Sequence, residues 1–86
     1  MTFEDMRVVE AHVADLHAGG LPVMLSTEYD RVDVDARALG AYGTVTLVDR
    51  LAQSLGRKGY VWDVWVDGVS NPGNRMIHVA EREEAG

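Results

Sequence analysis

The chain of 86 residues is long enough for one domain, and its 47% hydrophobic content is ordinary for a globular fold and argues against disorder. Its 14 acidic and 8 basic residues give a net charge of −6. This balance disfavours direct binding of nucleic acid, which needs clustered Lys and Arg, and it permits a partner protein with a basic surface. We therefore predict a single domain over residues 1–86.

What the sequence lacks narrows the class of protein further. The chain has no cysteine, so a disulfide, a thiol nucleophile and a thiolate metal site are excluded. The first residues form neither a basic region nor an apolar run, and no apolar stretch is long enough to span a membrane. We therefore expect a cytoplasmic protein with no membrane partner.

The first predicted element is an amphipathic helix that starts at Thr2 and ends before Gly19. Thr2 and Asp5 have the spacing of a capping box, with aspartate in place of the usual glutamate. Gly19 and Gly20, followed by Pro22, are typical of a helix end. The apolar residues that share one face at helical spacing are Phe3, Met6, Val9, Val13 and Leu16.

Two short strands are predicted next, over residues 21–28 and 31–36. In both, apolar and polar residues alternate, which is typical of a strand with one buried face. Because Tyr-Asp at 29–30 is a poor two-residue turn, a longer loop is the alternative to a tight hairpin. The tight hairpin would create the cross-strand pairs Leu25 with Val34, Thr27 with Val32 and Glu28 with Arg31.

A second helix is predicted from the region of Thr44 to Gly56, after a loop over residues 37–43. Thr44 or Thr46 would cap its start, and Asp49 lies three residues after Thr46. The predicted buried face consists of Val45, Val48, Leu51, Ala52 and Leu55.

The strongest strand signal lies over residues 60–68, and a last strand is predicted over 75–81. Between them, residues 70–74 have the composition of a turn. We expect the largely charged residues 81–86 to form a frayed tail. The alternation predicts the cross-strand pairs Val66 with Ile77, Val64 with Val79, Trp65 with His78 and Asp67 with Met76.

The predicted element order, α-β-β-α-β-β, indicates an α+β fold class. Each helix-and-hairpin unit has one apolar face, so the two units can bury these faces only by joining into one sheet. We predict a two-layer α/β sandwich in which two helices cover one face of a four-stranded antiparallel sheet. This order resembles a circularly permuted ferredoxin-like arrangement, and a likeness of fold implies no function.

Pairs of acidic residues are the first candidates for chemistry. Asp33 and Asp35 share a strand face with the arginines at 31 and 37, so a charge-balanced solvent face explains them more simply than a catalytic pair. Asp63 and Asp67 are separated by roughly 13 Å along a strand. That distance is too long for a shared metal ion without further ligands.

The histidines and serines give no stronger signal. His12 and His17 are five positions apart on a helix, so they lie on different faces. His78 is a lone strand histidine, usually only a surface residue, and no metal site is predicted. No serine has the context of a known nucleophile, and no glycine-rich nucleotide loop is present. We therefore expect a non-enzymatic protein with no cofactor.

Trp65 is the residue that the predicted fold leaves unexplained. Alternation points it away from the helices, on the same sheet face as Val61. Tryptophan is enriched at binding hot spots, and interfaces have an apolar centre with a polar rim. The alternative is that the loop over 37–43 or the C-terminal tail covers it. The predicted partner-binding residues are Trp65, Asp63, Asp67, Met76, His78, Asp33 and Asp35.

The resulting hypothesis is a small acidic interaction domain that binds a partner protein through the open sheet face, with a homodimer as a variant. The excess of Arg over Lys and the single Ile are typical of a GC-rich genome, such as that of an actinobacterium or one of its phages. A narrower hypothesis is therefore a phage-encoded inhibitor or nucleic-acid mimic. The alternatives are a structural component of a larger assembly, or an accessory or small-molecule-binding subunit of an enzyme system, with a cavity near Trp62, Tyr42 and Tyr60.

Overall fold

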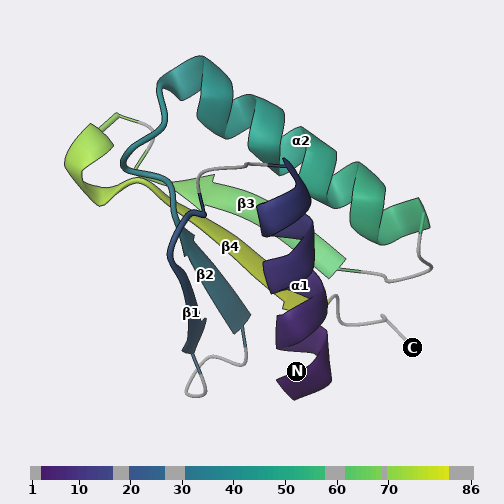
Figure 1. Ribbon diagram of the computed structural model, residues 1–86. Coiled ribbons are helices and arrows are strands. Elements are labelled where there is room, and N and C mark those ends of the chain that lie inside the picture. Colours follow the sequence, from purple (N-terminus) through teal and green to yellow (C-terminus); the bar gives the residue numbers. More distant parts are fainter. Residues whose placement is uncertain (1–2, 17–19, 27–30, 58–61, 69, 82–86) are drawn as a thin grey trace, which may run out of the picture.

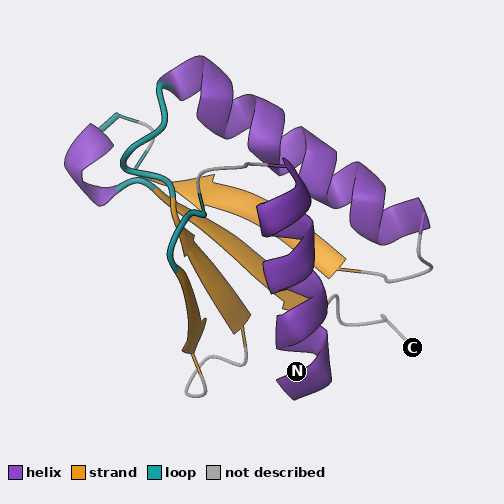
Figure 2. Cartoon of the chain, viewed as in Figure 1, coloured by secondary structure: helices purple, strands orange, loops and turns teal. Residues whose placement is uncertain are grey.

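The computed structural model describes residues 3–16, 20–26, 31–57, 62–68 and 70–81. A four-stranded antiparallel sheet forms one layer, and two helices cover one of its faces (Figures 1 and 2). The predicted α+β fold class is therefore confirmed. The elements in chain order are α1 (Phe3–Leu16), β1 (Val23–Ser26), β2 (Arg31–Asp35), α2 (Ala41–Arg57), β3 (Trp62–Asp67), the short 3-10 helix η1 (Pro72–Asn74) and β4 (Met76–Glu81).

The strands follow the order β1-β2-β4-β3, and every neighbouring pair is antiparallel. β4, the last strand of the chain, therefore lies between β2 and β3, which run parallel to each other. Since α2 connects these two strands, β2-α2-β3 is a split β-α-β unit of the kind found in ferredoxin-like folds. The insertion gives β4 a neighbour on both sides and places His78 in the interior of the sheet.

The hairpin of β3 and β4 has the predicted register. Trp65 lies across from His78, all four predicted pairs are observed, and no bulge interrupts the ladder. Glu81 pairs with Trp62, which corrects the prediction that the frayed tail begins at residue 81. Residues 82–86 lie outside the described residues.

The hairpin of β1 and β2 has a register two residues away from the predicted one. Leu25 pairs with Val32 and Ser26 with Arg31, so the two-residue turn is ruled out. A shift of two keeps each side chain on its predicted face, because side chains alternate with a period of two. The predicted pairs that fail are Leu25 with Val34, Thr27 with Val32 and Glu28 with Arg31.

The core lies between the helices and the inner face of the sheet. α1 contributes Val9 and Val13 from its predicted apolar face. Burying one such side chain stabilises the fold by about 1.5–3 kcal/mol relative to leaving it in water. The buried residues from the sheet are Val32, Val34, Trp62, Ile77 and Val79.

α2 begins about one turn earlier than predicted, at Ala41. The hydroxyls of Thr44 and Thr46 donate to the carbonyl oxygens of Gly40 and Tyr42. Neither threonine therefore caps the helix, because a hydroxyl bonded four residues back along the chain lies inside a helix rather than at its start.

The predicted buried face of α2 is confirmed for Leu51, Leu55 and the partly buried Val48, and it is wrong for Val45 and Ala52. Leu47, Leu51 and Leu55 are buried, whereas Val45 is 60% exposed and Ala52 is exposed. The observed orientation buries Leu47, and a leucine removes more apolar area from water than the smaller Val45 or Ala52 would. The helix is therefore oriented by its leucines.

Candidate functional site

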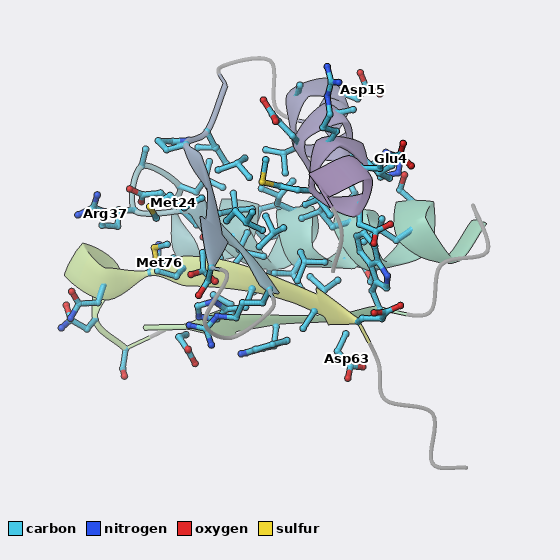
Figure 3. All side chains as sticks on the ribbon, turned by 90° about the horizontal axis from the view of Figure 1, so that it is seen from below. Glu4, Asp15, Met24, Arg37, Asp63 and Met76 are labelled. Carbon is cyan, nitrogen blue, oxygen red and sulfur yellow. The ribbon has the colours of Figure 1, made fainter. Side chains whose placement is uncertain are left out.

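The candidate site lies on the sheet face opposite the helices, which we call the outer face. Figure 3 shows both helices on one side of the sheet and the Asp63 side chain projecting from β3 on the other. Because paired residues of an antiparallel sheet point to the same face, the register arranges the outer side chains in rows. The central row holds Met24, Asp33, His78 and Trp65, and the flanking rows hold Asp35, Met76 and Asp67 on one side and Ser26, Arg31, Ala80 and Asp63 on the other.

His78 lies at the centre of the outer face and contacts a carboxylate with each ring nitrogen. Its Nδ1 is 2.6 Å from Oδ1 of Asp33, and its Nε2 is 2.8 Å from Oδ2 of Asp67. An ionised carboxylate only accepts, so both contacts are hydrogen bonds at once only when each ring nitrogen carries a proton. The two carboxylates lie at opposite nitrogens of the ring and therefore fix its orientation on the sheet.

This placement corrects the interpretation of His78 as a surface residue. Only 4% of the residue is exposed, because β2 and β3 flank it on both sides. Its burial depends on the pairing of β4 with β2, and alternation within one strand does not predict that pairing. His78 therefore connects Asp33 on β2 with Asp67 on β3, and its side chain is not accessible at the surface.

Trp65 occupies the predicted position on the outer face, across from His78. The two rings have centroids 5.3 Å apart and are tilted by 40°. Trp65 remains 37% exposed. The loop that was the alternative cover packs elsewhere, since Leu39 lies against the core on the helix side of the sheet. The tail after residue 81 lies outside the described residues.

Two of the predicted acidic residues are paired with arginines of their own segment. Arg31 Nε donates to Asp33 at 2.9 Å, and Arg37 Nε donates to Asp35 at 2.9 Å. The side-chain and backbone hydrogen bonds from Arg37 lower the pKa of Asp35, and the same carboxylate raises the pKa of Arg37. The arginines therefore balance both carboxylates, but these carboxylates are only 16% and 12% exposed, so the strand does not form the open solvent face that was predicted.

The exposed residues of the outer face are a subset of the predicted site residues, with one addition. The Asp67 side chain is 67% exposed although it bonds His78, and Asp63 is also exposed. Met24, which the sequence interpretation left out, is 49% exposed beside Asp33 on β1. Its alternation with Val23 and Leu25 was the signal that could have placed it there. Met76 is half-buried in a flanking row.

The arrangement around His78 does not provide a catalytic base. A general base needs a lone pair directed at the substrate, and both ring nitrogens of His78 already face a carboxylate. Among the described residues, no three His, Asp or Glu side chains lie close enough to hold a metal ion. The groups that this face exposes are the carboxylates of Asp63 and Asp67, the ring of Trp65 and the side chain of Met24.

A second buried histidine lies between the helices. His12 is 8% exposed, and its Nδ1 is 3.3 Å from the hydroxyl of Ser54 on α2. Its Nε2 has no hydrogen-bond partner among the described residues. The sequence interpretation gave His12 no role. His12 is next to the stripe of Val9 and Val13 on α1, and it is buried because α2 packs alongside, which local helical spacing does not predict.

The region proposed for a small-molecule cavity is divided between different environments. Trp62 is in the core, whereas Tyr42 on the first turn of α2 is 87% exposed. Tyr60 lies outside the described residues. A shallow hollow of about 180 Å³ instead lies beside α1 and β1, lined by Glu10, Val13, Ala14, Gly20, Leu21 and Val23.

Comparisons with family models, with curated proteins and with solved structures found no match to this chain. In the part of the chain that the structure describes, neither helix is long and apolar enough to cross a membrane.

Proposed function

We propose that this domain is a non-catalytic interaction module that binds a partner protein through its outer face. The observation that carries the proposal is Trp65, which is 37% exposed at a face that no described helix covers. Tryptophan supplies a large contact area with little loss of conformational freedom, and it is enriched among residues that dominate binding energy.

The contacts of Trp65 support the same proposal. Its ring lies against His78, and His78 is fixed by Asp33 and Asp67. A side chain already held in place loses little freedom when a partner binds, so less of the interaction energy is spent on ordering it. Met24, at the far end of the same row beyond Asp33 and His78, is exposed and offers a second, separate apolar contact.

The charge around Trp65 favours a partner with cationic side chains. Asp63 and Asp67 flank it along β3, and the whole chain has a net charge of −6. Asp33 and Asp35 are already bonded to arginines, which makes them poor imitations of a bare phosphate backbone. We therefore prefer a basic protein surface as the partner over the narrower hypothesis of a nucleic-acid mimic.

The test is affinity capture from extracts of the source organism with three versions of the domain. We expect the wild type and Tyr42→Ala to retain the same partner and Trp65→Ala to lose it. Tyr42 is the matched control, because it is an exposed aromatic residue on a helix away from the outer face. A partner that Trp65→Ala retains in full would disprove the proposal.

The ionic part of the proposal is tested on the captured partner. The dissociation constant should rise with salt, because ions screen attraction between exposed charges. The rise should be smaller for Asp67→Asn than for the wild type. A dissociation constant that is independent of salt would remove the basic surface from the proposal while leaving the role of Trp65 in place.

A further inference from the structure

β3 forms an open edge of the sheet. Its ladder with β4 runs without a bulge over the whole strand, and no other strand of the described part of the chain pairs with its second side. Alternate residues of such an edge direct their backbone N–H and C=O groups outward, where they can pair with another chain.

The two edges of the sheet differ in how well they are protected. β1 has four residues and directly follows Pro22, whose nitrogen cannot donate a hydrogen bond. β3 has six residues and contains neither proline nor lysine. Short strands, prolines and charged side chains are common devices against unwanted pairing. β1 has the first two, whereas β3 has only the charges of Asp63 and Asp67, which select among strands rather than block all of them.

The charges on β3 discriminate between occupants of this edge. Asp63 and Asp67 stand on either side of Trp65 on the outer face. An antiparallel second copy centred on Trp65 would place Asp63 of each chain opposite Asp67 of the other, and like charges directly opposite each other are destabilising. A strand from another protein that has cationic residues opposite Asp63 and Asp67 would instead be favoured.

We propose that β3 accepts a β-strand from the partner protein, with a basic residue opposite Asp63, an apolar residue opposite Trp65 and a basic residue opposite Asp67. The pattern Asp-x-Trp-x-Asp reads the same in both directions, so a parallel or an antiparallel strand of the form basic-x-apolar-x-basic satisfies it. This inference rests on the proposed function and names the segment that the outer face recognises.

The experiment uses the full domain and a synthetic peptide, acetyl-Thr-Lys-Thr-Ile-Thr-Lys-Thr-amide, followed by amide and indole NMR shifts. We expect the amides of β3 to shift and to exchange more slowly with solvent, and the Trp65 indole to shift with them. The same peptide with both lysines replaced by glutamate should bind more weakly, by up to about fivefold per charge pair. A peptide with proline in place of isoleucine should not bind, because it breaks the extended ladder.

The variant Asp63→Lys tests the charge complementarity. It should weaken binding of the lysine peptide and strengthen binding of the glutamate peptide. Asp15→Lys is the matched control, since it makes the same charge change at an exposed position on α1 (Figure 3) and should leave the affinity of both peptides nearly unchanged in physiological salt, which screens distant charges. If the Trp65 indole shifts while the β3 amides do not, the outer face binds without strand addition, and the inference fails while the proposed function stands. If neither responds, or if Asp15→Lys acts as Asp63→Lys does, strand addition at β3 is wrong. The capture experiment then decides the proposed function by itself.

Discussion

The two faces of β4 bury their side chains for different physical reasons. On the inner face, Ile77 and Val79 are fully buried among aliphatic residues. On the outer face, the residue between them, His78, is almost as well buried, but by two carboxylates and a tryptophan ring. The inner contacts depend on shape and apolar area, whereas the outer ones depend on charge and on the direction of hydrogen bonds.

This difference indicates what each face can tolerate. An apolar core accepts swaps of similar volume at small cost. A polar network does not, because removing one member leaves a partner without its hydrogen bond. The outer face is also the one that leaves Trp65 partly exposed, with its ring against the His78 of the network. The following variants test this contrast, in order of expected effect.

The largest effect should come from the inner face. Leu51→Ala on α2 removes a fully buried side chain, so we expect the free energy of unfolding to fall by about 3 kcal/mol. The measurement is chemical denaturation. Val45→Ala, on the exposed side of the same helix, is the control and should change stability by less than about 0.5 kcal/mol. Equal losses for the two variants would mean that α2 has the orientation predicted from the sequence.

His78→Leu should destabilise the domain by about 2–3 kcal/mol, because it leaves the Asp33 carboxylate without its partner. The loss stays below that of a fully buried ion pair because Asp33 keeps Arg31. Adding Asp33→Asn to His78→Leu should recover part of the stability, and thermal and chemical denaturation of the single and double variants measure the coupling. Additive effects of the two substitutions would contradict a shared network.

Trp65→Ala should cost about 1 kcal/mol of stability, since the side chain is partly exposed in the folded domain. Fluorescence separates the two tryptophans of β3. In the variant Trp65→Phe the remaining Trp62 should be shielded from acrylamide, because it is 9% exposed. In Trp62→Phe the remaining Trp65 should be quenched readily. Equal quenching of the two would place both indoles in the same environment and contradict the two-faced strand.

The smallest effect should come from Asp35→Asn, at the exposed end of the outer face. The folded domain lowers the pKa of Asp35 below its ordinary value of 3.8 through hydrogen bonds from Arg37. The pair therefore stabilises the wild type above that pH, and the contribution disappears as the pH falls through the lowered pKa. Asp35→Asn should slightly reduce stability at neutral pH and make little difference in strong acid. The comparison is the melting temperature of both proteins across the acid range, and a gap that does not narrow would exclude the ion pair as its cause.

Local pattern predicted the elements of this protein because their periodicity is a property of the chain itself. The alternation in β3 and β4 predicted which faces pair, and the turn-like residues 70–74 between the strands predicted the register. Helical spacing predicted the buried valines of α1. For α2 the same approach was right for Leu51, Leu55 and the partly buried Val48, and wrong for Val45 and Ala52. Contact with the sheet rotates the buried stripe toward Leu47.

The sequence by itself determined the fold class, the strand faces and the position of Trp65 on the outer face, because each of these follows from the period of neighbouring residues. Only the tertiary structure decided what surrounds that tryptophan. The insertion of β4 between β2 and β3 brings Asp33 to His78 from another part of the chain and buries a histidine that pattern alone assigns to the surface. The order of strands in a sheet depends on how whole elements pack together, so the spacing of neighbouring residues does not predict it.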